Sequence, residues 1–155
     1  MHHTDDATGL PCACTTLRKA SRAVSRVYDA ALAPLGLTSV QFSILRNVQR
    51  AGEVPLSRLA ERLVMDRTSL YRTLAPMQRA GWVDVAAAGG RAKQVSLTAA
   101  GRKLAGAAAS RWEAAQRTVV EAFGVERWTE LQAGIDALTA VGVAAVGGGA
   151  EESAA

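Results

Sequence analysis

The chain has 155 residues, of which 49% are apolar and 5% aromatic, and it carries a formal net charge of +4. This length suits one domain with a sizeable hydrophobic core. No apolar run is long enough to span a membrane, because charged residues interrupt every one. Alanine supplies much of the apolar content, and an alanine-rich, aromatic-poor chain favours helix.

Positive charge is concentrated in residues 56–103. That segment holds nine Lys and Arg against three Asp and Glu, a balance of +6, so the remainder of the chain carries −2. Positive charge gathered on one segment is what a polyanionic partner requires. The alternative is a solvated basic face that binds no partner. A helix-turn-helix is predicted in the same segment, which makes this alternative the less favoured one.

Residues 1–10 hold His2 and His3 but no apolar stretch, so they do not resemble a secretory signal peptide. We expect these residues to be disordered and the protein to be cytoplasmic. Cys12 and Cys14 stand too close in sequence for a structural disulfide, and reduced thiols fit that compartment. Because both histidines are terminal and no His or Cys cluster exists, we expect neither a metal nor a cofactor.

Apolar residues at spacings of three and four predict a first helix over residues 11–32, ended by Pro34 and Gly36. Thr38–Gln41 is a capping-box sequence, with a hydroxyl at the N-cap and a glutamine three residues later. It predicts a second helix, which stops at Gly52.

Residues 56–79 predict a helix-turn-helix. Its first helix is short and amphipathic, with Ser57 as the expected N-cap. Asp66 is expected to cap the second helix, where a carboxylate also favours the positive helix end. The positions of that second helix predicted to be buried are Leu70, Leu74 and Met77.

Two short strands are predicted next, over residues 82–85 and 94–97, with Gly89 and Gly90 in the turn between them. A hairpin of this kind after a helix-turn-helix is a wing, and the whole unit holds one helix in a DNA major groove. Thr98 is then expected to cap another helix, which Gly124 ends before a last helix.

The predicted fold class is therefore mainly α (α+β), a winged helix-turn-helix over residues 38–97. Helices over residues 11–35 and 98–146 flank it, and residues 147–155 are expected to form a disordered tail. The apolar stripes of the flanking helices are wider than packing against the winged helix alone would bury. We expect them to form a dimer interface, because two-fold dimers read paired half-sites; the alternative is a bundle packed within one chain.

The residues expected to contact DNA lie on the second helix of the helix-turn-helix, at the start of the helix before it and in the wing. Arg72 suits a guanine or a phosphate because its guanidinium forms two parallel bonds. Arg91 at the wing tip suits the minor groove. The full set is Ser57, Arg58, Arg67, Thr68, Ser69, Tyr71, Arg72, Arg91 and Lys93.

Several stretches in this order resemble the multiple-antibiotic-resistance regulator (MarR) family of winged-helix repressors. They are Leu35–Phe42, Leu59–Leu63, Asp66–Leu70, Arg79–Val83 and Arg91–Gly101. The resemblance implies a homodimer with intertwined N- and C-terminal helices that reads a palindrome and is released by a small ligand or by oxidation. Family wings usually carry an Asp two residues before the arginine that matches Arg91, and Gly89 stands in that place here.

The segment Cys14–Tyr28 also resembles the organic-hydroperoxide sensors (OhrR) of this family. That resemblance implies that Cys14 is oxidised and that Tyr28 is one of the tyrosines orienting its sulfur, whereas Arg18 replaces the second tyrosine. A thiol at a helix N-terminus beside cations holds more thiolate, which peroxides convert to sulfenic acid. Cys12 would then be the resolving thiol, within the chain or across a dimer.

Two alternatives to oxidation of Cys14 remain open for the signal that releases the DNA. Cys14 can be a small buried hydrophobic residue with Cys12 inactive, and the effector can be a small aromatic or phenolic ligand between the winged lobe and the dimer helices. The sequence offers Tyr28 and Trp112 as apolar candidates for such a ligand site.

The sequence contains no paired carboxylates in a pocket-like context, no Ser-His-Asp set and no phosphate-binding glycine loop, so we do not expect an enzyme. We predict a homodimeric DNA-binding transcriptional regulator, a repressor of a palindromic operator. The alternative is a winged-helix module that binds protein and not DNA.

Overall fold

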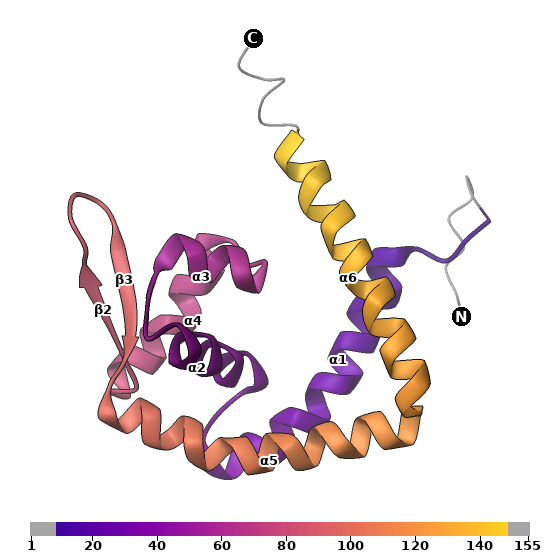
Figure 1. The fold of residues 1–155 in the computed structure, drawn as a ribbon, viewed down its shortest axis with the longest axis horizontal. Coiled ribbons are helices and arrows are strands. Elements are labelled where there is room, and N and C mark those ends of the chain that lie inside the picture. Colours follow the sequence, from indigo (N-terminus) through magenta and orange to yellow (C-terminus); the bar gives the residue numbers. More distant parts are fainter. Residues whose placement is uncertain (1–8, 149–155) are drawn as a thin grey trace.

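The computed structural model describes residues 9–148, which form an open C shape (Figure 1). One arm is a lobe of short helices with a protruding hairpin, and the other arm consists of α1 and α6. The long helix α5 forms the base that joins them. The elements in chain order are α1 (Ala13–Leu32), the 3-10 turn η1 (Ala33–Leu35), α2 (Ser39–Ala51), β1 (Glu53–Pro55), α3 (Leu56–Leu63), α4 (Arg67–Arg79), β2 (Val83–Ala87), β3 (Lys93–Leu97), α5 (Ala99–Phe123) and α6 (Val125–Gly148).

The three strands form one antiparallel sheet in the order β1-β3-β2. In β1, Glu53 pairs with Ser96 and Pro55 with Gln94, and β2 pairs with all five residues of β3. The predicted extended link at Val54–Pro55 is thus a short edge strand, a position that tolerates proline. The described part of the chain is a winged helix-turn-helix with added helices, which confirms the predicted fold class.

The helix caps explain where the helices of the winged lobe begin. Thr38 accepts a hydrogen bond from the Gln41 N–H, and the Gln41 side chain accepts one from the Thr38 N–H, so the predicted capping box is formed. Asp66 caps α4 and Thr98 caps α5, each through its side chain.

The prediction that Ser57 caps α3 is wrong. The N-cap is Pro55, and Ser57 lies inside the first turn of α3. The chain enters this helix directly from β1, so strand pairing up to Pro55 fixes the start of the helix. Leu56 is then free to turn inward, where it is 5% exposed.

The hydrophobic core lies in the winged lobe and continues onto α5. Phe42, Leu45 and Val48 of α2 are buried at the centre, and α4 adds its three predicted core residues. The fully buried residues that α5 adds to this core, Ala105 and Ala108, are small, which allows the helix to approach closely, and the larger Leu104 and Trp112 pack against the core while only partly buried. The core therefore holds the winged lobe and one half of α5 as one body.

The opposite half of the molecule is sparsely packed. No residue of α6 between Val125 and Val146 is buried, and Val141 and Val146 are 65% and 79% exposed. α6 extends to Gly148, so the first two residues of the tail predicted over 147–155 are helical, and the rest lies outside the described residues, as do residues 1–8. Within residues 9–148, no helix is both long and apolar enough to cross a membrane.

The wing is joined to α5 through a close backbone contact at Gly101. The Thr98 hydroxyl donates to the Gly81 carbonyl at 2.6 Å and accepts from the Gly101 N–H at 3.0 Å, while the Thr98 N–H donates to the Trp82 carbonyl. A Cβ atom on Gly101 would lie 1.9 Å from the Trp82 carbonyl oxygen. Only glycine fits this position.

We expect Gly101→Ala to destabilise the protein by about 1–3 kcal/mol or more, because the added methyl meets backbone and not a mobile side chain. Gly106→Ala is the matched control on the same helix, since nothing lies within 4 Å of a Cβ there. It should raise stability by about 0.5–1 kcal/mol through helix propensity. Denaturant unfolding of both variants is the measurement, and equal effects would contradict this account of the junction.

Candidate nucleic-acid interface

Helix α4 is divided cleanly into a buried face and an exposed face. Leu70, Leu74 and Met77 are at most 1% exposed. The exposed positions of α4 are Arg67, Thr68, Tyr71, Arg72, Ala75, Gln78 and Arg79. The arginines and Thr68 point away from the core as the sequence predicts. Ala75 was missed by sequence reasoning, although its position three residues after Arg72 places it on the same face.

The start of α4 is held by Asp66. Its carboxylate accepts hydrogen bonds from the Ser69 N–H at 2.8 Å and the Ser69 hydroxyl at 2.6 Å. Both hydrogen bonds lower the pKa of Asp66 below its ordinary value, and the bond from the Ser69 hydroxyl has the larger effect. The capping carboxylate is therefore ionised at neutral pH. The Ser69 hydroxyl is thus engaged with the cap, which leaves it less available for a base than Thr68.

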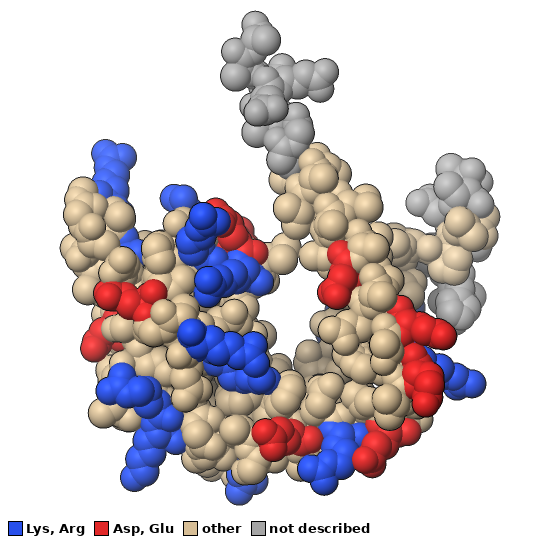
Figure 2. Space-filling model, viewed as in Figure 1, with Lys and Arg blue, Asp and Glu red and all other residues tan. Residues whose placement is uncertain are grey.

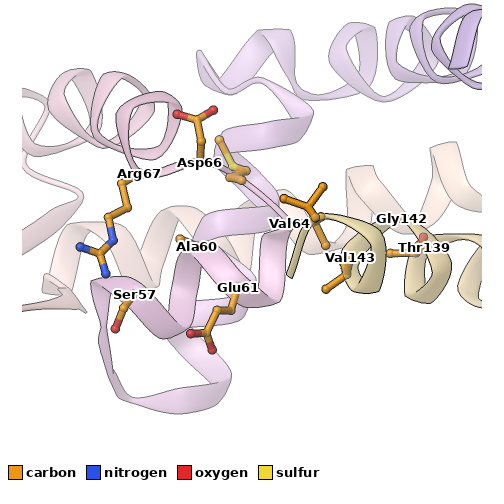
Figure 3. Close-up of a pocket in the computed structure, with 11 residues that line it drawn as sticks. Ser57, Ala60, Glu61, Val64, Asp66, Arg67, Thr139, Gly142 and Val143 are labelled. Carbon is orange, nitrogen blue, oxygen red and sulfur yellow. The ribbon is translucent and has the colours of Figure 1, made fainter. Parts of the chain in front are cut away.

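The two residues of α3 that are expected to contact DNA differ in how free they are to do so. Arg58 forms an ion pair with Glu61 at 3.1 Å, with both side chains more than 60% exposed. An exposed pair of this kind is worth at most about 1 kcal/mol, so a phosphate can compete for the guanidinium. Ser57 is half-buried and lies near Arg67 on the wall of a cavity (Figure 3).

The wing presents two cations. Gly89 and Gly90 have φ values of +102° and +57°, a conformation that favours glycine, and they form the predicted turn. Arg91 follows at the exposed tip. Lys93 lies at the start of β3, and its Nζ atom is 5.2 Å from the centroid of the Tyr71 ring on α4. The structure thus brings two residues of the predicted set into contact with each other.

Basic side chains are most concentrated over the winged lobe. Figure 2 shows Lys and Arg side chains gathered over the winged lobe, with fewer Asp and Glu side chains among them, whereas Asp and Glu side chains are more frequent on the side of α5 and α6. Among the described residues, Arg58–Glu61 is the sole ion pair, so Arg67, Arg72 and Arg91 carry uncompensated charge. Apart from the exposed Arg58–Glu61 pair, this face can accept a polyanion without first breaking an internal ion pair.

Two residues of the predicted redox site, Cys14 and Tyr28, do not meet within one subunit. Cys14 is exposed in the first turn of α1 and Cys12 is the N-cap. Tyr28 lies fourteen residues further along the same helix, about 21 Å away at the helical rise of about 1.5 Å per residue. Burial raises the pKa of Tyr28, whose hydroxyl donates to Gln116 Oε1. Tyr28 can therefore orient the Cys14 sulfur only across a dimer.

Tyr28 belongs instead to an aromatic cluster with Trp112, the other residue named in the sequence as a candidate for an apolar ligand site, and with Phe42 and Arg46, which the sequence did not indicate. Its ring lies 6.2 Å from Trp112, which is also 6.2 Å from Phe42, and the Arg46 guanidinium stacks 4.1 Å above the Trp112 ring. The cluster joins α1, α2 and α5. Neither the spacing nor the type of these residues predicts it, because they come from three separate helices.

A cavity of about 680 Å³ separates the helix-turn-helix from the end of α6. Figure 3 shows Val64, at the end of α3, facing Val143 of α6, while Arg67 and Ser57 lie at the other side. Val64 has a φ of +50°, which is unusual for a β-branched residue. Within residues 9–148, no three His, Cys, Asp or Glu side chains are grouped to hold a metal ion.

Comparison with known proteins identifies the family. Residues 37–101 match the model of a winged helix DNA-binding domain. The transcriptional regulator MosR of M. tuberculosis is 36% identical, with 86% of this chain and 96% of MosR covered and a TM-score of 0.76. The structure of MosR with DNA is 38% identical over 81% of this chain and 97% of that one, with a TM-score of 0.70.

The chain belongs to the MarR family of winged-helix transcriptional regulators. A mutant MarR from E. coli, in complex with operator DNA, is 19% identical over 80% of this chain and 91% of that chain, with a TM-score of 0.73, so it shows the shared fold. No curated protein sequence matches this chain. The prediction of a winged-helix DNA-binding regulator is confirmed, and the protein-binding alternative is not favoured.

Proposed function

We propose that this protein is a homodimeric repressor that reads a palindromic operator with α4 and the wing, and that it is not an enzyme. The observation that carries the proposal is the exposed polar face of α4, which lies beside an exposed wing without internal ion pairs. The related MosR is described in complex with DNA. A regulator that binds operator DNA works beside the chromosome, so we propose a cytoplasmic location.

Dimerisation is supported by apolar surface that one chain leaves uncovered. Leu17, Val24 and Val27 on α1 are 39–40% exposed, and Leu131 and Leu138 on α6 are each 43% exposed. Apolar patches of this kind mark interfaces. A second copy would cover them, and two winged lobes would then read half-sites whose centres lie about 34–36 Å apart, or a multiple of that distance.

Within the DNA interface, we assign base recognition to the exposed face of α4 and phosphate binding to its surroundings. Thr68 and Arg72 lie on the face that would enter the major groove, and Arg72 can bind guanine through two bonds. Arg67 at the start of α4 and Arg58 on α3 suit phosphates, and Arg91 suits the minor groove. Ser57, Ser69, Tyr71 and Lys93 complete the proposed set.

We expect Arg72→Ala to weaken operator binding by about 1–3 kcal/mol and to relax the base preference at one position of each half-site. Selection of bound DNA from a random pool, followed by affinity measurements at several salt concentrations, tests both effects. Arg111→Ala, at an exposed arginine of α5 outside the proposed interface, is the control. Unchanged affinity and unchanged selected sequence for Arg72→Ala would contradict the assignment of α4 as the reading helix.

We further propose that oxidation of Cys14 releases the DNA. The thiolate attacks an organic peroxide, the O–O bond breaks, and the sulfur gains one oxygen while the alkoxide takes a proton and leaves as alcohol. The resulting sulfenic acid condenses with the Cys12 thiol to give a disulfide and water. The exposure of Cys14 and the position of both residues at the start of a proposed dimer helix support this proposal.

We expect an organic hydroperoxide to lower operator affinity at least tenfold in the wild-type protein and to have no effect on Cys14→Ser. Cys12→Ser should still respond, but it should accumulate sulfenic acid, which mass spectrometry detects as the addition of one oxygen. A Cys14→Ser variant as sensitive as the wild type would contradict the redox proposal. The cavity between Val64 and α6 would then be the favoured site for a small apolar or aromatic effector, in keeping with CouR of Rhodococcus jostii RHA1, described as bound to p-coumaroyl-CoA.

A further inference from the structure

The outer part of the wing has little to hold it in place. β1 pairs with β3 only from Ser96 to Gln94, so beyond Gln94 the sheet has two strands. A two-stranded ribbon is marginally stable in water by itself. Residues 86–92 are alanine and glycine apart from Arg91, so the ribbon has almost no side chains with which to pack against α4.

Lys93 lies just beyond the point where β1 stops pairing with β3. It pairs with Ala87 of β2 and is the first residue of β3 without a partner in β1. Its ammonium lies over the ring of Tyr71, 5.2 Å from the ring centroid. The two side chains line a cleft of about 170 Å³ between α4 and the wing, whose other walls are Leu74, Ala75, Gln78 and Val85.

We propose that Tyr71 is a positioning residue, whose ring holds the Lys93 ammonium and with it the outer wing at a fixed distance from the reading helix. This inference rests on the proposed DNA interface. The face of an aromatic ring attracts a cation through its quadrupole. A lysine side chain has four flexible carbons, so an ammonium held in advance loses less conformational entropy when it binds a phosphate.

The consequence is that a neutral residue controls an ionic contact. Each phosphate neutralised by a side chain adds about 0.9 to the slope of log affinity against log salt concentration. Loss of the Tyr71 ring removes no charge from the protein. If Tyr71 only contacted a base, its loss would change the affinity and leave the salt slope unchanged. If it positions Lys93, its loss also lowers the slope.

The salt dependence of operator binding by the full chain tests the inference. We expect Lys93→Met to lower the slope by about 1, and Tyr71→Leu to lower it by a measurable fraction of that amount. The double variant should have the slope of Lys93→Met, with the two losses of affinity non-additive by about two- to fivefold. Tyr71→Phe, which keeps the ring, should keep the wild-type salt slope, whatever the loss of its hydroxyl does to the affinity.

A measurement without DNA keeps the inference falsifiable if Tyr71→Leu does not fold. The chain has three lysines, Lys19, Lys93 and Lys103, so their side-chain NMR signals can be distinguished. We expect ring current to shift the ε-CH₂ protons of Lys93 upfield of those of the other two in the wild-type protein. This shift should persist in Tyr71→Phe.

Two outcomes overturn the inference: an unshifted Lys93 signal, or an unchanged salt slope in Tyr71→Leu alongside a lowered slope in Lys93→Met. Arg72→Ala separates these outcomes from failure of the proposed function. If Arg72→Ala weakens binding while Tyr71→Leu keeps the wild-type slope, the positioning role alone is wrong. If neither Arg72→Ala nor Lys93→Met affects binding, the proposed DNA interface is wrong, and the inference falls with it.

Discussion

The burial of one face of α4 determines the rest of the proposed interface. Leu70, Leu74 and Met77 are closed into the same core as Phe42 and Leu45 of α2. Successive residues of a helix are rotated by a fixed angle, so fixing these three side chains fixes the rotation of the whole helix. Turning α4 to hide its arginines would expose three large apolar side chains, at a cost of about 1.5–3 kcal/mol each. The polar face of α4 therefore points outward because the apolar face must stay in the core.

The neighbours of α4 place that outward face in a defined setting. The Asp66 carboxylate fixes the residue at which the helix begins, and the left-handed turn at Val64 sets its angle to α3. At the other end, the chain reverses at Gly81 and enters the wing, which the contact between Gly101 and Trp82 ties to α5. The reading helix and the wing are thus attached to the same long helix, α5, which leads to the proposed dimer helices.

Features that depend on local sequence could be predicted well. The spacing of apolar residues gave the buried face of α4, and single residues gave the caps at Thr38, Asp66 and Thr98, because a cap needs only a side chain and the turn that follows it. The cap of α3 was predicted wrongly because the start of that helix depends on the pairing of β1 with a strand about forty residues later.

Contacts between distant segments could not be read from the sequence. The engagement of Lys93 with Tyr71, the cluster around Trp112 and the cavity between Val64 and Val143 each join residues from separate elements. The separation of Tyr28 from Cys14 is of the other kind, because both residues lie on the helix that the sequence already predicts over residues 11–32. Composition indicated which side chains were available but not which of them are engaged with one another.

Hydrogen–deuterium exchange of the full chain, with and without operator DNA, tests the central claim most directly. We predict that bound DNA protects backbone amides in α4 (Arg67–Arg79) and the outer wing (residues 86–93), with little change in the middle of α5. Protection confined to α1 and α6, with α4 and the wing unchanged by DNA, would contradict the claim that the outward face of α4 reads the operator.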